Sequence, residues 1–246
     1  MQTLGQDGVL VVTDRFSRDE VDTINAALAE LIEEVVPANI REKSSGAVRT
    51  AMGLHLRHRV FERLVRDIRL IEPANQLLGE PFYVQQVKVN IKDAFVGEQW
   101  QWHHDFGTHH NEDGVPEPLA LNMHIFLDEV TEYNGPLMFV RGSHRDGPPP
   151  STLDSTTTSF DLWTVGADVV GPLAERGGFI CPKGPPGTML IFGDAIVHGS
   201  PPNMSPWPRR IFSLIVNPIS NRQRHLKRAD HFHHRDFSPL TPSVPA

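Results

Sequence analysis

Residues 82–92 read FYVQQVKVNIK, a run in which hydrophobic and polar side chains alternate. An extended chain with this pattern places Val87, Val89 and Ile91 on one face. The opposite face is polar and carries Gln86, Lys88, Asn90 and Lys92. Further strand-like runs follow at 119–127, 136–140, 188–192 and 211–217. Short strands separated by turns, without alternating helices, predict a mainly β fold of the double-stranded β-helix type, a jelly-roll or cupin-like barrel, rather than a parallel α/β sheet.

The N-terminal third predicts helices outside this barrel. Residues 8–12 read as a short strand, and Ser17 with Glu20 forms a capping box that opens an amphipathic helix extending to about residue 35. Residues 42–55 are small, polar and aperiodic, and a helical spacing of hydrophobic residues resumes from Val60 to Leu70. We therefore expect flanking N-terminal α-helices that pack against a sheet.

Residues 147–187 are rich in Pro, Ser, Thr and Gly, with a short hydrophobic patch only. A connection of this length inside a compact domain is typically a functional lid or a mobile insert. A chain of 246 residues with 39% hydrophobic residues can form one substantial core. We expect a single domain over residues 1–246, with 147–187 as its lid or insert.

The charge balance argues against two classes of partner. With 30 acidic and 23 basic residues the net charge is −7, and no long Lys/Arg run is present to bind nucleic acid or an anionic membrane. No targeting signal or membrane span is evident, which predicts a cytoplasmic protein. The lone Cys181 excludes an internal disulfide framework and is interpreted as a structural thiol. The sequence does not distinguish a monomer from a homodimer.

The segment QWQWHHDFG (99–107) contains a candidate metal site. His103 and Asp105 are two positions apart, so on an extended chain both face one ion while His104 faces away. His-x-Asp alone is weak evidence in a chain with 13 histidines. His198, which follows the strand-like run at 188–192, is the best candidate for a third ligand. Two imidazoles and one carboxylate form the facial triad of non-haem iron(II) oxygenases.

A candidate anion-binding residue follows the third ligand. The chain reads HGSPPNMSPWPRR from His198 to Arg210, and Arg209 stands at the start of the next predicted strand. A guanidinium there can bind a carboxylate bidentately. An oxygenase that uses 2-oxoglutarate needs such a cation, because the keto acid end chelates iron and the far carboxylate must be held. The alternative is a surface arginine in an ordinary ion pair.

At this point the sequence resembles the phytanoyl-CoA dioxygenase superfamily, and within it the bacterial ectoine hydroxylases and free L-proline 4-hydroxylases. The resemblance covers residues 7–240. It is carried by YVQQVKVNIKDAFVG (83–97), WHHDFGTHHNEDGVP (102–116), NGPLMFVRGSH (134–144), GPPGTMLIFGDAIVHGSPPNMSPWPR (184–209) and RDFSPL (235–240).

The resemblance implies roles for individual residues. His103, Asp105 and His198 correspond to the iron ligands, Arg209 to the residue that binds the distal carboxylate of 2-oxoglutarate, and Ser200 to its hydroxyl partner. Other positions that correspond to the cosubstrate site are Trp100, Asn122, Lys88 and Asn90. Gln86 corresponds to a substrate-binding position. A solvated strand face is the alternative for the polar residues of 86–90.

The chain departs from the ectoine hydroxylases directly after the triad aspartate. They read DFETWH, whereas residues 105–110 read DFGTHH, so His109 stands where they carry a substrate-facing tryptophan. We expect His109 to face the substrate and to set its identity, and ectoine itself is in doubt. The alternative is a surface role for His109. His55, His58 and His124 are interpreted as packing or surface residues, and His231, His233 and His234 as part of a polar tail.

These features together predict a dioxygenase that uses Fe(II), 2-oxoglutarate and O2 to hydroxylate an unactivated C–H bond of a small amino acid or amino-acid-like metabolite, releasing succinate and CO2. The same chemistry on a natural-product intermediate, with desaturation or cyclisation as an outcome, is the first alternative. A catalytically inactive barrel that only binds ligands is a remote one. A zinc hydrolase lacks its usual motifs here and leaves Arg209 without a task.

Overall fold

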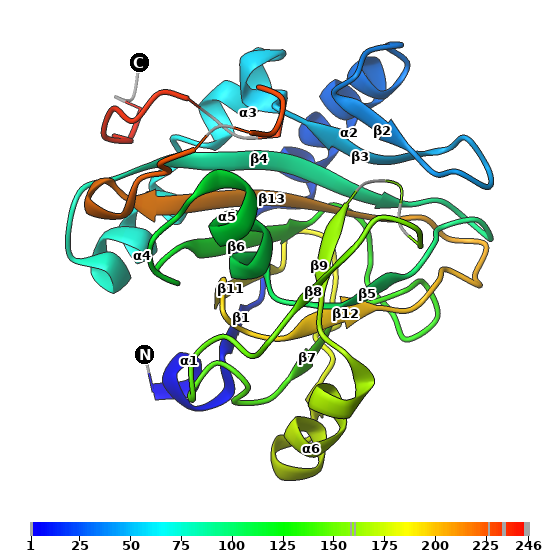
Figure 1. The fold of residues 1–246 in the computed structure, drawn as a ribbon. Helices are drawn as coiled ribbons and strands as arrows, with labels where there is room; N and C mark the ends of the chain where they lie inside the picture. The colour runs from blue at the N-terminus through cyan, green and yellow to red at the C-terminus, as the bar shows by residue number, and fades with distance from the viewer. Residues whose placement is uncertain (1, 158, 160, 226, 233–234, 244–246) are drawn as a thin grey trace.

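A computed structural model of the chain describes residues 2–157, 159, 161–225, 227–232 and 235–243. Two antiparallel sheets face one another (Figure 1). The major sheet has the order β1-β11-β6-β13-β4-β3-β2 and consists of Val9–Val12, Met189–Gly193, Leu121–Phe126, Arg209–Pro218, Phe82–Lys92, Val48–Met52 and Asn39–Arg41. The minor sheet has the order β10-β7-β12-β5-β9-β8 and consists of Phe179–Ile180, Met138–Val140, His198–Ser200, Trp100–His103, Leu162–Thr164 and Thr152–Asp154. This arrangement confirms the predicted jelly-roll class.

The alternation of residues 82–92 decides what each face of the major sheet contacts. Strand β4 pairs with β13 along its whole length, and Val87, Val89 and Ile91 are buried against the helices. The opposite face points between the two sheets. Gln86 and Lys92 are buried there, and Lys88 and Asn90 line an internal cavity. The alternative of a solvated polar face is therefore wrong.

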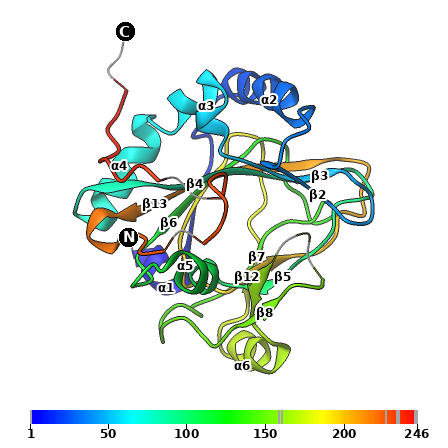
Figure 2. The ribbon, with the colours of Figure 1, turned by 45° about the horizontal axis from the view of Figure 1, so that its top comes forward.

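Helices cover the outer face of the major sheet, as Figure 2 shows. Those that pack into its core are α2 (Arg18–Ile32), α3 (Arg59–Leu64) and α4 (Ile68–Leu78). The predicted capping box is present, with Ser17 accepting from the Glu20 N–H and the Glu20 side chain accepting from Ser17. Helix α2 ends three residues earlier than expected, at Ile32, and Val35 beyond it is 91% exposed. None of the helices in the described part of the chain has the length and apolar character that a membrane crossing requires.

Two segments that looked irregular in the sequence contain regular structure. Residues 42–55 include strand β3, all five residues of which are buried, so burial on both faces hides any alternation. This strand makes the N-terminal third less helical than predicted. Residues 147–187 contain β8, β9 and β10 and the helix α6 (Ala167–Gly177). The minor sheet supplies their hydrogen-bond partners, with β9 pairing to the end of β5 at His103, which the local composition does not reveal.

The space between the sheets is divided by polarity. One part is an apolar core that includes Phe126, Phe139, Leu190 and Phe192. The remainder is lined by polar side chains from the inward faces of β4, β6 and β13 and from the facing strands β5 and β12. Because buried polar groups require partners, this second part is where a ligand-binding site is expected.

Candidate metal and cosubstrate site

Three predicted ligand residues lie together at the junction of the minor sheet and a helix. His103 ends β5, His198 begins β12, and the two residues are direct antiparallel partners. Asp105 begins helix α5 (Asp105–Asp113). One ligand atom from each residue lies within 4.8 Å of the others, and the described residues contain no other group of this kind.

The conformation between the first two ligands differs from the expectation of an extended chain through Asp105. His104 adopts an extended conformation but caps α5, its Nδ1 accepting the Gly107 N–H at 3.0 Å. Its Nε2 contacts the Pro149 carbonyl at 2.9 Å, so the ring faces away from the other two histidines, as predicted. The chain turns into helix α5 directly after His104, and this turn brings the Asp105 carboxylate back toward His103. The expected strand would instead have brought the two side chains together by placing them on the same face.

Backbone carbonyls fix the orientation of both ligand imidazoles. The Nδ1 of His103 lies 2.7 Å from the Gln101 carbonyl, and the Nδ1 of His198 lies 3.0 Å from the Ile196 carbonyl. A carbonyl only accepts, so each Nδ1 carries the proton and each Nε2 presents its lone pair. The two Nε2 atoms lie 3.7 and 4.0 Å from Asp105 Oδ1.

Electrostatics keep the donor set in the form that a metal needs. Burial lowers the pKa of His103 to about 3, and the nearby His198 adds to this, so the His103 ring is neutral. Burial opposes ionisation of Asp105, but His198, Lys88 and His103 together hold its pKa below the usual range. Two imidazoles that present their Nε2 atoms and one carboxylate, on adjoining elements, fit the facial donor set of non-haem iron(II).

A cavity extends from this donor set toward Arg209. It is lined by Lys88, Asn90, Trp100, His103, Asp105, His124, Leu137, His198 and Arg209. Arg209 is 1% exposed; its Nε and Nη2 donate to the Gly135 carbonyl at 3.1 and 2.8 Å, and Nη2 also to Ser200 Oγ at 3.4 Å. Burial lowers the pKa of Arg209 to about 9, so it is still charged at neutral pH.

Arg209 lacks the carboxylate partner that a buried guanidinium requires. No carboxylate of a described residue lies within salt-bridge distance of it, whereas the adjacent Arg210 pairs with Asp128 at 2.5 Å. An unpaired buried cation is costly, and a bound anion would offset that cost. The alternative of an ordinary surface ion pair therefore describes Arg210 rather than Arg209.

The interior face of β6 carries buried polar groups, one of which lines the cavity that reaches Arg209. Asn122 is fully buried, and neither its Oδ1 nor its Nδ2 has a protein partner. His124, interpreted from the sequence as a packing or surface residue, lies on the same face two positions on and lines the cavity. Both ring nitrogens of His124 lack hydrogen-bond partners. So does the hydroxyl of Ser213, the residue opposite His124 on the neighbouring strand β13. The period of two between Asn122 and His124 was the signal that could have identified His124.

A second cavity opens on the other side of the donor set. It shares Lys88, Trp100, His103 and Asp105 with the first. Its other walls are Met52, Gln86, Thr108, His109, Leu162 and Arg228. Gln86 and His109, the predicted substrate residues, thus lie at this end. Arg228 was not identified from the sequence, because the C-terminal segment carries no strand or helix period that would relate it to the site.

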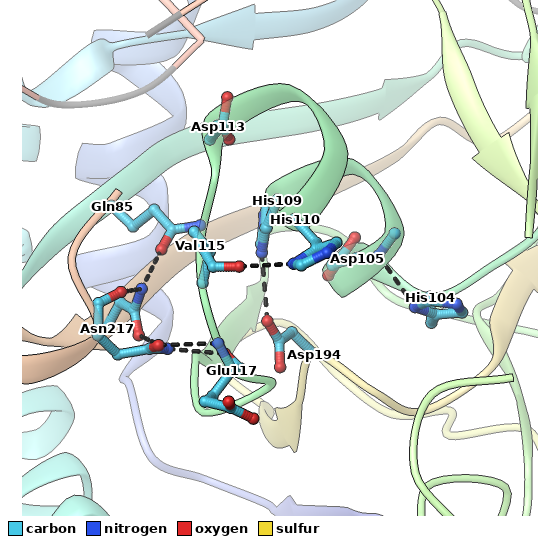
Figure 3. Close-up of polar contacts among 12 residues, drawn as sticks. Gln85, His104, Asp105, His109, His110, Asp113, Val115, Glu117, Asp194 and Asn217 are labelled. Atoms are coloured by element: carbon cyan, nitrogen blue, oxygen red, sulfur yellow. Dashed lines mark hydrogen bonds and ion pairs between the residues drawn. The ribbon is translucent and has the colours of Figure 1, made fainter. Parts of the chain in front are cut away.

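His109 is held by a buried carboxylate that sequence reasoning also missed. From helix α5 its ring points toward Asp194 (Figure 3), with Nδ1 3.3 Å from Asp194 Oδ2. Both side chains are buried, at 4% and 0% exposure, so the alternative of a surface role for His109 is wrong. Burial raises the pKa of Asp194 to about 6, although the His109 hydrogen bond opposes this shift. Asp194 therefore fixes the orientation of the ring that lines the second cavity.

Comparisons with known proteins identify relatives over most of the chain. A model of the phytanoyl-CoA dioxygenase (PhyH) family matches residues 4–211. Ectoine dioxygenase from Sphingopyxis alaskensis is 36% identical over 227 residues, which cover 88% of this chain and 74% of that protein. L-proline trans-4-hydroxylase from Streptomyces griseoviridis is 35% identical over 248 residues, covering 97% of this chain and 92% of that one.

A solved structure shares the fold closely. The crystal structure of EctD from S. alaskensis with 2-oxoglutarate and 5-hydroxyectoine superposes with a TM-score of 0.85 at 32% identity, covering 98% of this chain and 85% of that one. The structure of the same protein with bound Fe gives the same TM-score at 33% identity. The predicted resemblance is confirmed.

Proposed function

Because the chain belongs to the phytanoyl-CoA dioxygenase family, we propose that it is an Fe(II)- and 2-oxoglutarate-dependent dioxygenase that hydroxylates a small amino acid or amino-acid-like metabolite. The observation that carries this proposal is the pairing of a two-histidine, one-carboxylate donor set with a buried, charged arginine that lacks a carboxylate partner in the described chain. Neither a hydrolase nor an inactive barrel requires both.

His103, Asp105 and His198 would hold the iron, and Arg209 with Ser200 would hold the distal carboxylate of 2-oxoglutarate. When bound, iron and 2-oxoglutarate activate O2 so that an unactivated C–H bond becomes C–OH while succinate and CO2 leave. Two of the metal ligands, His103 and Asp105, line both cavities, so one metal centre would serve the cosubstrate from one cavity and the substrate from the other. Asn90 and His124, which line the first cavity, would form part of the polar wall of the cosubstrate end, and the buried, unpartnered amide of Asn122 would extend it along β6.

The chain's own residues would orient the reactants and exclude water. The carbonyls of Gln101 and Ile196 hold the ligand imidazoles in one tautomer and one rotamer. The buried guanidinium of Arg209 fixes the cosubstrate by a charged contact in a low-dielectric interior, where such contacts are strong. Gln86 and His109 would contact the primary substrate on the opposite side.

Several names of relatives support a small substrate. The relatives act, by name, on ectoine and on L-proline. In this chain His109, held by Asp194, stands where the ectoine hydroxylases carry a tryptophan, which argues against ectoine itself. A free amino acid or a cyclic derivative is the class proposed.

We also propose a role for residues 147–187 and a cellular location for the enzyme. Residues 147–187 would cover the substrate, since Leu162 lines the second cavity and Trp163 Nε1 donates to Glu112 on α5 at 3.1 Å. Residues 1–246 would act as a single oxygenase domain. Cys181 is a free, exposed thiol, which suits the reducing cytoplasm, where we propose that the enzyme acts.

The test is a screen for coupled turnover. The purified protein is loaded anaerobically with Fe(II) and 2-oxoglutarate, its iron content is measured, and free amino acids and their cyclic derivatives are supplied in air. Succinate formed in proportion to a hydroxylated product supports the proposal. Failure to bind iron, or absence of succinate under every condition, contradicts it.

A further inference from the structure

Asp194 is a buried carboxylate that the metal and cosubstrate sites do not use. It lies in the turn between β11 and β12, and its side chain is fully buried. Its Oδ2 lies 3.3 Å from His109 Nδ1, and its Oδ1 has no hydrogen-bond partner. No lysine or arginine among the described residues lies within salt-bridge distance of it. A buried carboxylate without a cation is costly, and a bound cation would offset this cost.

The hydrogen bond with Asp194 decides how His109 presents its ring to the second cavity (Figure 3). An ionised carboxylate only accepts, so Nδ1 donates to Asp194 and Nε2 carries the lone pair. Within the described part of the chain Nε2 has no hydrogen-bond partner, and it is not among the fully buried atoms. Since His109 lines the second cavity, its Nε2 is an acceptor within reach of a ligand there.

Gln86 adds a second acceptor to the same cavity. Its side-chain Nε2 donates to the Phe232 carbonyl, an interaction that fixes which way the amide points. The amide oxygen Oε1 is thereby left for a ligand, and Gln86 lines the second cavity together with His109. The cavity therefore offers two acceptors, a pattern suited to a group with two or more N–H donors.

The other charges at this end already have partners of opposite sign. The Arg228 guanidinium forms a bidentate pair with the Asp113 carboxylate, with Nε 2.8 Å from Oδ1. Lys88 lies near Asp105, and its charge helps to keep the pKa of that carboxyl low. By contrast, the Asp194 carboxylate behind His109 has no lysine or arginine to balance it in the described chain. A positively charged ligand group bound to His109 would do so.

The hydrogen-bonding character at this position is the reverse of that in the ectoine hydroxylases. They carry a tryptophan where this chain has His109. An indole N–H can only donate a hydrogen bond, whereas His109 held by Asp194 accepts one at Nε2. A substrate must therefore present a donor at this point of the cavity.

We propose that His109 Nε2 accepts a hydrogen bond from the protonated amino group of the primary substrate, with Gln86 Oε1 as a second acceptor and Asp194 as a positioning residue. The carboxylate of Asp194 holds the ring in one tautomer and attracts the ammonium through it. This inference rests on the proposed function and adds the group by which the substrate is selected. Compounds that keep a free amino group are substrates, and those in which carbon replaces the amino nitrogen are poor ones.

The first experiment compares each amino acid with an isostere that lacks the amino group. The iron- and 2-oxoglutarate-loaded enzyme is assayed with the proteinogenic amino acids and L-pipecolate. Any accepted amino acid is then compared with the acid in which carbon replaces the amino nitrogen, for example L-proline with cyclopentanecarboxylate. We expect the isostere to lose about 10- to 100-fold in kcat/KM, the size expected for hydrogen bonds to a charged group.

Variants at His109 test the acceptor directly. His109→Phe keeps a planar ring but has no acceptor, so it should raise KM for the amino acid about 10- to 100-fold while changing KM for the isostere little. His109→Gln retains an amide oxygen that can accept, and it should keep part of the preference for the amino acid. The matched control is His110→Phe, the same substitution at the next, exposed position of α5, which should leave both KM values unchanged.

Asp194→Asn tests the positioning role, because it removes the charge while keeping the size of the side chain. KM for the amino acid should rise about tenfold, with kcat, KM for 2-oxoglutarate and iron content close to wild type. An iron content equal to that of the wild type shows that α5 still places Asp105 correctly.

Equal rises in KM for the amino acid and the isostere in His109→Phe would mean that His109 only packs α5, and the inference is overturned. It is also overturned if isosteres without the amino group are accepted as well as amino acids. The role of Asp194 is overturned if Asp194→Asn leaves KM for the amino acid unchanged. In each of these cases iron binding and succinate formation persist, so the proposed function survives. Absence of both defeats the proposed function itself.

Discussion

The two ends of the site each contain an arginine, but the two arginines are held differently. Arg209 lies at the start of β13, is 1% exposed, and donates to a backbone carbonyl and a serine hydroxyl on neighbouring elements. Arg228 lies in a C-terminal segment without regular structure, is 16% exposed, and is held by a carboxylate on α5. The first lacks a carboxylate partner among the described residues, and the second has one.

The two ends also differ in the parts of the fold that form them. The Arg209 end is built from paired strands that also carry His103 and His198, and it lies within the region that the family model matches. The Arg228 end also uses strand residues, among them Met52 of β3 and Gln86 of β4, but adds residues of α5, of 147–187 and of the C-terminal segment. We therefore expect the metal and cosubstrate chemistry to depend on the paired strands, and substrate selectivity to depend chiefly on the residues that α5, residues 147–187 and the C-terminal segment add.

The largest effect is expected from the ligands that both ends share. His103→Ala, Asp105→Ala and His198→Ala should each lower kcat roughly a thousandfold or more, because two remaining ligands cannot hold the iron in an open facial geometry. Iron content after anaerobic loading and succinate formation are the measurements. Full activity in one of these variants would remove that residue from the triad.

A smaller effect, confined to one end, is expected from Arg209→Ala. KM for 2-oxoglutarate should rise about 30-fold or more, and far more than KM for the primary substrate, because the distal carboxylate would be left buried and unpaired. Arg210→Ala is the matched control, since that guanidinium pairs with Asp128 instead. A larger rise of the 2-oxoglutarate KM in Arg210→Ala than in Arg209→Ala would mean that Arg210, and not Arg209, binds the cosubstrate.

The two ends also differ in how far the sequence reveals them. The alternation over residues 82–92 correctly predicts which face of β4 points inward, because a buried face enforces a period of two. His103, Asp105, His198 and Arg209 follow from motif and resemblance, and the structure brings them to one cavity.

Other features depend on tertiary contacts that leave no local trace. Strand β3 is buried on both faces, and the strands of 147–187 obtain their partners from the minor sheet. Asp194 and Arg228 reach the substrate end from segments with no period that points there. His124 could have been identified, because it shares the period of two with Asn122.

The substrate end should give the protein a distinct pH dependence of stability through Asp194. Burial raises its pKa from 3.8 to about 6, so the folded protein binds this proton more tightly than the unfolded chain. The contribution of this proton to the free energy of unfolding is complete below about pH 4 and is lost as the pH rises through about 6, by up to roughly 3 kcal/mol. Asp194→Asn cannot titrate and is the reference. The free energy of unfolding is measured with denaturant from pH 4 to 7, and the wild-type value minus the variant value should fall across that window. A rise in this difference would mean that ionic attraction to His109 outweighs burial.

The smallest effect concerns selectivity and tests whether the substrate end is set by His109. His109 lines the second cavity from α5, and Asp194 fixes its ring, so His109→Trp replaces an oriented hydrogen-bonding group by a larger aromatic surface. We expect the ratio of kcat/KM between two accepted substrates to shift about tenfold, the size typical of one changed contact in a binding pocket, with a smaller change in KM for 2-oxoglutarate. His110→Trp is the matched control, because His110 is exposed and its Nδ1 contacts the Val115 carbonyl at 2.9 Å outside the cavity.

If both variants keep the wild-type ratio, His109 serves the packing of α5 against Asp194, and selectivity must come from Arg228 and Gln86. If His110→Trp shifts the ratio as much as His109→Trp does, the cause is a distortion of α5, which also carries Asp105, and the separation between the two ends is weaker than their construction indicates.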